Sequence, residues 1–400
     1  MLTTWRLSGF YFFYFAFVGV ASPYLAQYLQ QLGFSAFEIA VLVSQMQLMR
    51  IIAPNLWGWL ADHGGRRLSI IRLTSWLSLL AVVSFYFVSG FWAWWIAIGA
   101  MAFFWSASLP LFEGVTLDQI KANGGDYSRI RLWGSVGFIV TVSAAGWLLD
   151  RLPLDSIRGM LLALLFGLLV FALLVRDPFA PHPSADREPL WPVLRSRRVG
   201  TLLAACFAMS AAHGAFYLFF SIYLAGLGYS QTAIGLLWSL GVVAEIVVFI
   251  FMAPLFRRFS IRSILLACFA AAVVRFLLTA WAAEWLLLLI LAQLLHALTF
   301  GAFHSAAIQS VNCWFPVGCQ ARGQALYSSL SFGAGGLLGG IIAGAIWDVA
   351  GGPVAYTVSA FFALLGGLLV LQGISRADEL VGDDPAVLSG RIAPVLPEEN

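Results

Sequence analysis

The sequence predicts an all-α integral membrane protein whose twelve transmembrane helices form two six-helix halves. Three observations lead to this prediction: the composition, the distribution of basic residues and an internal repeat. Of the 400 residues, 61% are hydrophobic and only 10% are charged, whereas roughly 25% of residues are charged in soluble domains. The hydrophobic residues number about 244, which is enough for about twelve spans of ~20 residues each. The composition therefore excludes an ordinary soluble enzyme.

Polar residues, glycines and prolines divide the chain into apolar stretches long enough to cross a membrane. The predicted spans are 7–31, 36–61, 69–89, 91–117, 130–149, 159–175, 200–225, 232–256, 263–282, 285–312, 323–347 and 354–373. Only Arg6 is charged before the first stretch, which is longer than a signal-peptide core, so we expect a retained first span. The four cysteines have neither zinc-finger nor CxxC spacing and indicate no metal site.

The basic residues fix the expected orientation. Of the 22 Lys and Arg residues, 18 fall in segments on the side of the N-terminus, and only Arg151 and Arg158 fall on the other side. Arg50 and Arg275 lie within spans. By the positive-inside rule, we expect a multi-pass protein of a bacterial-type inner membrane with both termini in the cytoplasm. No basic block is suited to nucleic acid.

An internal repeat divides the spans into six and six. Leu32-Gly33-Phe34-Ser35 recurs 195 residues later as Leu227-Gly228-Tyr229-Ser230. The segment 176–198 holds five prolines among charged residues, and we expect it to be an extended cytoplasmic linker. The predicted halves are therefore 1–175 and 199–375, and residues 376–400 form an acidic tail. Two parallel halves with a site between them are typical of a transporter.

The loop after the second span carries a recognisable pattern. Gly58, Asp62, Gly65, Arg66 and Arg67 follow the spacing of the signature loop of the major facilitator superfamily, which this loop resembles. Gly58 is expected to permit close helix approach, and Asp62 is expected to accept hydrogen bonds from the N-terminus of a neighbouring helix. The alternative is an ordinary basic loop that only sets the orientation.

Charged side chains inside spans are expensive, so each is a candidate for function. Glu113 lies late in span 4 and Arg131 early in span 5, where antiparallel helices can bring them together as an ion pair. Their separation and context resemble the lactose permease and oligosaccharide:proton symporter group, and more closely the 3-phenylpropionate permease group. That resemblance covers nearly the whole chain and implies that Glu113 and Arg131 bind substrate. The alternative is a structural clasp at the membrane edge.

Three further polar residues are candidates for proton coupling. Glu245 lies mid-span among apolar residues, and a buried acid can be neutral in one access state and ionised in the other. The resemblance to lactose permease implies a coupling role for Arg275 and His296. One position departs from that pattern, since Thr299 stands where lactose permease carries a glutamate three residues after the histidine. The proton carrier thus stays open among Glu245, Glu113 and His296, and a structural ion pair is the alternative for Glu245.

Histidines are expected to line the central cavity. His296, Phe300 and His304 recur every four residues and so follow one stripe of helix 10. Within the superfamily, helices 1, 4, 7 and 10 line the cavity, which implies that His213 and His304 contact substrate. Hydrogen-bonded packing is the alternative, whereas a shared metal ion is a poor alternative because the i, i+8 separation of the two histidines of the stripe is too long for one ion.

The function expected from the sequence is proton-coupled uptake by alternating access of a small substrate, an anionic aromatic carboxylate such as 3-phenylpropionate. The alternatives are a sugar or nucleoside proton symporter and a drug:proton antiporter. A non-transporting membrane sensor is disfavoured because no long soluble segment is present. An enzyme is disfavoured because no nucleophile–base constellation occurs. We expect a monomer in the lipid bilayer that needs no cofactor beyond the proton.

Overall fold

The computed structural model describes residues 4–64, 67–176 and 190–375, and every regular element in these ranges is a helix. The N-terminal half contains one helix for each predicted span. These are α1 (Thr4–Gln31), α2 (Ala36–Gly64), α3 (Arg67–Val83), α4 (Phe91–Asn123), α5 (Tyr127–Leu149) and α6 (Ser156–Leu174). A short 3-10 helix, η1 (Ser84–Tyr86), extends α3.

Several spans of the C-terminal half are broken helices. Span 7 consists of α8 (Arg197–Ala212) and α9 (Gly214–Gly226), and spans 8 and 9 are α10 (Gln231–Arg258) and α11 (Ile261–Trp281). Span 10 consists of α12 (Leu286–Leu294), the π-helix η2 (Ala297–Ala302) and α13 (Phe303–Trp314). After η3 (Val317–Cys319), span 11 runs through α14 (Gln320–Ser328), the π-helix η4 (Ser329–Gly335) and the first part of α15 (Gly336–Gly373).

A sharp turn divides α15 into spans 11 and 12. Gly351 has a φ of 79°, a left-handed conformation that glycine adopts without strain, and Pro353 follows it. The described residues therefore contain twelve spans although α15 is continuous. The outer faces carry exposed apolar side chains such as Ile250 and Leu287, as expected for a surface in contact with lipid.

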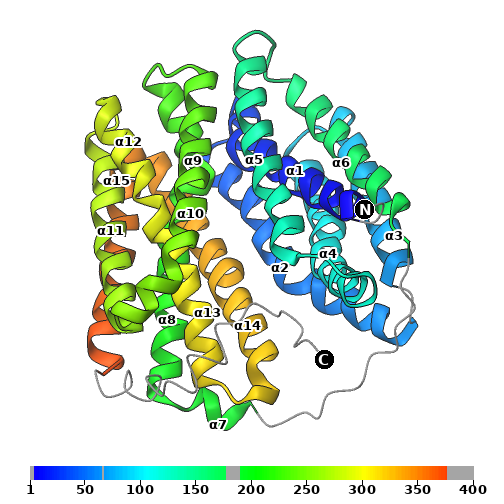
Figure 1. The fold of residues 1–400 in the computed structure, drawn as a ribbon. Helices are drawn as coiled ribbons and strands as arrows, with labels where there is room; N and C mark the ends of the chain where they lie inside the picture. The colour runs from blue at the N-terminus through cyan, green and yellow to red at the C-terminus, as the bar shows by residue number, and fades with distance from the viewer. Residues whose placement is uncertain (1–3, 65–66, 177–189, 376–400) are drawn as a thin grey trace.

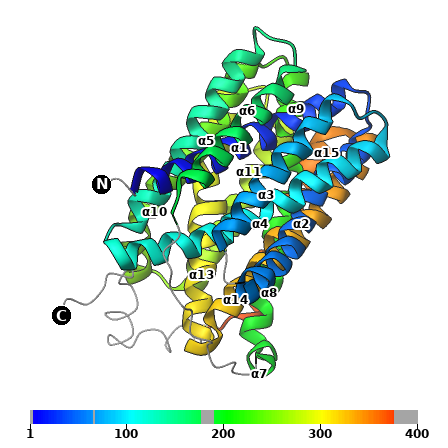
Figure 2. The same cartoon turned by 90° about the vertical axis from the view of Figure 1, so that its right-hand side faces the viewer.

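The two halves meet at one end of the molecule (Figure 1). There, Gln27 of α1 donates to the carbonyl of Ser221 in α9 (2.7 Å), and the hydroxyls of Ser143 in α5 and Ser239 in α10 are 2.7 Å apart. The helix pairs that bring the halves together are α5 with α10 and α2 with α15, and Figure 2 shows the second pair along one edge. We call this the closed end, made of residues 24–40, 139–150, 221–239 and 340–348. At the opposite end, the described residues form no hydrogen bond between the halves.

Glycines bring helix backbones close together inside the N-terminal half. A Cβ on Gly137 of α5 would lie 2.2 Å from the carbonyl oxygen of Phe12 in α1. Gly58 differs, because no described atom lies within 4 Å of a Cβ placed there. The prediction that Gly58 permits close helix approach is therefore wrong in this conformation.

These two glycines give a matched test of packing. We expect Gly137→Ala to destabilise the protein by ~1–3 kcal/mol, because α1 and α5 must separate to admit the methyl group. Thermal unfolding in detergent should show a lower Tm. Gly58→Ala, the control, should leave the Tm unchanged or raise it, since alanine is the better helix former. Equal Tm values for both variants would contradict the close α1–α5 contact.

The predicted linker is partly helical. Residues 177–189 lie outside the described residues, as does the acidic tail 376–400. Within the described part, α7 (Trp191–Leu194) is helical and α8 begins at Arg197, so the prediction of an extended segment up to 198 is wrong at its C-terminal end. Pro192 lies in the first turn of α7, where a proline does not interrupt the helix.

Candidate functional site

Five buried polar residues from spans 7 to 10 form one group, which we call the C-half cluster. His296, at the start of η2, places its Nε2 atom 2.7 Å from Oε1 of Glu245 in α10. Arg275 of α11 donates from Nη1 to Thr299 of η2 (3.2 Å), and the same nitrogen lies 3.0 Å from Nε2 of His213, between α8 and α9. All five side chains are buried. The structure therefore brings together the three predicted coupling residues and His213.

The tautomer of His213 follows from its contacts. Its Nδ1 atom is 2.8 Å from the carbonyl oxygen of Met209, which only accepts, so Nδ1 carries the proton. The Nε2 atom is then an acceptor for Arg275. Thr299 also lies 3.3 Å from this Nε2. The residue that departs from the lactose permease pattern thus holds Arg275 and His213 in place.

Arg275 is a buried cation without an adjacent acid. Within the described ranges no carboxylate lies at ion-pair distance from its guanidinium, and its Nη2 atom has no hydrogen-bond partner. Its Nε atom donates to the carbonyl of Ala292 (3.1 Å), and its guanidinium carbon is 4.2 Å from the ring centroid of Phe216. Glu245 is near enough for its charge to act on Arg275. Because a buried charge needs compensation, the ionised form of Glu245 balances Arg275.

One proton therefore sets the charge of the whole cluster. With Glu245 ionised and both histidines neutral, the cluster carries no net charge, and with one proton added it carries a single positive charge. The 2.7 Å contact allows this proton to lie on Glu245 or on His296. The Nδ1 atom of His296 has no partner among the described residues. The cluster can thus take up or release a proton without breaking a hydrogen bond to His213.

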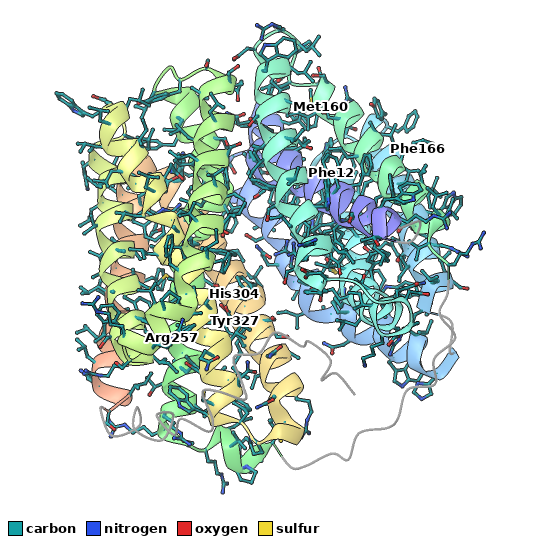
Figure 3. The ribbon with its side chains drawn as sticks, viewed as in Figure 1. Phe12, Met160, Phe166, Arg257, His304 and Tyr327 are labelled. Atoms are coloured by element: carbon teal, nitrogen blue, oxygen red, sulfur yellow. The ribbon has the colours of Figure 1, made fainter. Side chains whose placement is uncertain are left out.

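A cavity lined by residues of spans 7, 10 and 11 adjoins the C-half cluster. His213 and Thr299 belong to both, so the cavity reaches the cluster directly. Its other walls include Ser210, Tyr217, Phe300, His304, Tyr327 and Phe332. His304 Nδ1 and the hydroxyl of Tyr327 are 2.8 Å apart, and Figure 3 shows these two side chains next to each other. The cavity is thus lined mainly by aromatic rings, with a few polar groups among them.

The predicted histidine stripe is confirmed. The ring centroids of His296 and Phe300 are 5.5 Å apart, and those of Phe300 and His304 are 6.1 Å apart. The helix there is nevertheless a π-helix, η2, and a second π-helix, η4, contributes Phe332 to the same cavity. Such π-helical turns within α-helices are frequent at functional sites.

The N-terminal half contributes a second group, the N-half cluster. Tyr127 donates to Oε1 of Glu113 (3.4 Å). The guanidinium carbon of Arg131 lies 4.1 Å from the ring centroid of Phe15 and 5.6 Å from that of Tyr11. The expected Glu113–Arg131 ion pair is not formed in the described structure, because Arg131 lies over the aromatic rings of α1 instead. Arg131 is near enough for its charge to act on both Glu113 and His304, so the N-half cluster lies near the cavity wall that contains His304.

The remaining predicted residues lie outside these clusters. Arg67, at the start of α3, is 3.5 Å from Asp118 of α4, and this ion pair connects the loop after α2 to α4. Gly65, Arg66 and the side chain of Asp62 lie outside the described residues. Arg50 of α2, the repeat equivalent of Glu245, is exposed, with its guanidinium carbon 5.5 Å from the Trp105 ring centroid.

Sequence reasoning missed Tyr327 and the ring of Phe15. Both are aromatic residues in aromatic-rich spans, so their composition gives no signal. Tyr327 occurs in one of the least apolar stretches of its span, next to Ser328 and Ser329, and that local polarity is the only indication of a cavity wall.

Comparisons with known proteins agree with the fold. Residues 4–358 match the model of the MFS_1 like family. The chain is 30% identical to a probable 3-phenylpropionic acid transporter of Escherichia coli (strain K12), over 90% of this chain and 95% of the relative. It is 26% identical to a maltose permease of Geobacillus stearothermophilus, over 94% and 95%. The crystal structure of a mutant of the nucleoside transporter NupG aligns with a TM-score of 0.84 at 18% identity, over 94% of this chain and 100% of the other.

Twelve spans in two halves, with polar clusters facing a cavity, define a multi-pass membrane transporter of the major facilitator type. The chain belongs to the MFS_1 like family. Its relatives are transporters of small molecules rather than enzymes.

Proposed function

We propose that this transporter carries a small aromatic carboxylate, such as 3-phenylpropionate, together with a proton. The observation that carries the proposal is the C-half cluster, whose net charge changes from zero to +1 when one proton binds. An anion that enters the adjoining cavity is then attracted only after protonation. Proton and substrate thereby favour each other's binding, which is the thermodynamic requirement for coupling.

The N-half cluster supplies the expected carboxylate contact. Arg131 has a guanidinium that no carboxylate in the described chain holds at ion-pair distance. A guanidinium binds a carboxylate with two parallel hydrogen bonds. Phe15 lies against the guanidinium of Arg131, and Phe300 and Phe332 line the C-half cavity, so each half supplies aromatic surface for the ring of the substrate. The name of the Escherichia coli relative agrees with this substrate class.

The setting of the transporter is part of the same proposal. We expect it in the bacterial inner membrane as a monomer, with both termini in the cytoplasm and no cofactor beyond the proton. The closed end then faces the periplasm, and the N- and C-half clusters are reached from the cytoplasm.

Uptake into proteoliposomes tests the proposal. We expect labelled 3-phenylpropionate to accumulate when the outside is more acidic, by about tenfold per pH unit for one proton per anion. The internal pH should fall in parallel. Because a monoanion and a proton carry no net charge together, the membrane potential should have no effect. The neutral acid also crosses bilayers by itself and reaches the same distribution, so the initial rate of uptake is compared with that of protein-free liposomes.

Two results would contradict the proposal. Protein-dependent uptake that ignores the pH gradient would exclude proton coupling. Robust uptake of maltose or uridine without uptake of 3-phenylpropionate would exclude the carboxylate and favour the sugar or nucleoside alternative.

A further inference from the structure

Two aspartates join the halves at the closed end. Asp150, directly after α5, accepts hydrogen bonds from the backbone N–H groups of Gln231 (2.7 Å) and Thr232 (3.0 Å) at the start of α10. Asp348, near the end of span 11 in α15, accepts from the backbone N–H groups of Ala36 (2.9 Å) and Phe37 (2.8 Å) at the start of α2. Each half therefore contributes one aspartate that accepts from a helix start of the other half, and one helix start whose N–H groups donate to the aspartate of the other half.

The two helices whose N–H groups bind the aspartates, α2 and α10, begin in the same way because of the internal repeat. Gly33 and Gly228 have φ values of 91° and 88°, and Ser35 and Ser230 follow as the N-cap residues. Ser35 accepts from the N–H of Glu38, and Ser230 accepts from that of Ala233, so each serine satisfies the third free N–H of its helix. The first two N–H groups of each helix stay free for a partner. The aspartate of the other half takes both.

The helices that position the two aspartates, α5 and α15, also share a sequence pattern. Gly146 precedes Asp150 by four residues, and Gly344 precedes Asp348 by four, so glycine and carboxylate lie on the same helix face. A Cβ on Gly146 would lie 2.4 Å from the carbonyl oxygen of Gln231, and one on Gly344 would lie 2.8 Å from that of Ala36. In each case the glycine lets the helix approach the residue whose N–H the aspartate accepts.

We propose that Asp150 and Asp348 are a matched pair of gating residues that hold the closed end shut and must both release before the central cavity opens there. Each carboxylate forms charge-assisted hydrogen bonds and lies at the positive end of a helix dipole. The receiving residues are 195 apart and the aspartates 198 apart, so the two contacts are equivalent under the repeat. Loss of either contact favours the state that is open at this end.

The Asp150 contact persists at neutral pH. Partial desolvation raises the pKa of this carboxyl group, but the hydrogen bonds from Thr232 and Gln231 and the charge of Arg151 outweigh that effect, and the pKa lies below its ordinary value. A lowered pKa means that the contact exists above this value and weakens only as the pH falls through it. Gating at this contact therefore depends on movement of the halves rather than on mild acidification.

Hydrogen–deuterium exchange of the full-length protein in nanodiscs, without substrate, tests the inference. The inference rests on the proposed function only where it concerns transport. Hydrogen–deuterium exchange without substrate therefore tests the gating contacts even if the proposed substrate or the proton coupling is wrong. We expect each single variant, Asp150→Asn or Asp348→Asn, to shift the ratio of the two access states on the order of tenfold, and the double variant more. Exchange should rise in residues 36–45 and 231–240 and fall at the opposite end, in residues 113–123 and 303–328.

The control is Asp155→Asn, because Asp155 lies in the same loop as Asp150 but pairs within its own half with Arg158 (2.9 Å). It should leave exchange at both ends unchanged. If the double variant exchanges faster at residues 36–39 and 231–234 alone, with the opposite end unchanged, the aspartates are local helix caps and the inference is wrong.

A second measurement covers the case in which the double variant does not insert. The Ser143→Cys/Ser239→Cys pair spans the halves at the closed end, where the native hydroxyls are 2.7 Å apart. Disulfide formation should be several-fold slower with either single aspartate variant than with Asp155→Asn. Equal rates in all backgrounds would overturn the inference.

Discussion

Glu245→Gln is expected to abolish uphill accumulation of substrate and to preserve its exchange. Glutamine has the shape of the protonated acid and keeps a hydrogen bond to His296, whose Nε2 atom is 2.7 Å from the native carboxylate. It cannot ionise, so the C-half cluster keeps the positive charge of Arg275 at every pH. The anion should therefore bind and exchange as in the protonated protein, while the pH gradient no longer changes its affinity.

The measurement compares two assays of the same proteoliposomes. Counterflow exchange of labelled 3-phenylpropionate should stay within about twofold of the unmodified protein, whereas the initial rate of pH-driven uptake should fall to that of protein-free liposomes. Glu284→Gln is the matched control, because Glu284 is an exposed acid in the loop between α11 and α12. Undiminished accumulation by Glu245→Gln would return Glu245 to a structural role beside His296.

Arg131→Ala is expected to reduce substrate affinity on the order of a hundredfold while the protein still inserts. The variant removes the guanidinium over Phe15 that is proposed to hold the carboxylate in two hydrogen bonds. The substrate affinity of Arg131→Lys should lie between those of the unmodified protein and Arg131→Ala, since an ammonium group keeps the charge but loses the planar two-bond geometry. Glu113→Gln is expected to reduce substrate affinity to a similar extent, through the network with Tyr127.

Binding is measured by calorimetry on purified protein, with far-ultraviolet circular dichroism to confirm the fold. Arg151→Ala is the control, because Arg151 lies over Trp147 at 4.1 Å, the same distance as Arg131 over Phe15, but at the far end of α5. Normal binding by both Arg131→Ala and Glu113→Gln would assign these residues to packing at the membrane edge.

The spans and the candidate residues were predictable from the sequence, but the contacts between them were not. Hydropathy identifies helices because lipid-exposed backbone must satisfy its own hydrogen bonds. The sequence also indicated Glu245, Arg275 and His296 as candidates for proton coupling, because ionisable side chains inside spans are rare. It could not show that Arg275 bonds to His213 rather than to an acid, because this depends on how α8, α11 and η2 pack.

Two errors have specific causes. Arg131 lies near enough to Glu113 for its charge to act on that carboxyl group, but the guanidinium packs over the rings of α1, which the spacing along the chain does not encode. The aspartates of the closed end were missed because the search for function concentrated on charges inside spans. The repeated pattern of a glycine four residues before an aspartate, at 146–150 and 344–348, is the signal that could have found them.

The turn at Gly351 has a consequence for the speed of gating. Asp348 stands three residues before this turn, and the left-handed glycine and Pro353 connect span 11 to span 12 without an intervening loop. The carboxylate therefore cannot leave α2 by a nanosecond loop fluctuation. It leaves when the packed body of the C-terminal half rotates, a motion of microseconds to milliseconds. Because this motion is much faster than the chemical exchange of an amide proton, the protection of the Ala36 and Phe37 amides should report the population of the rotated state.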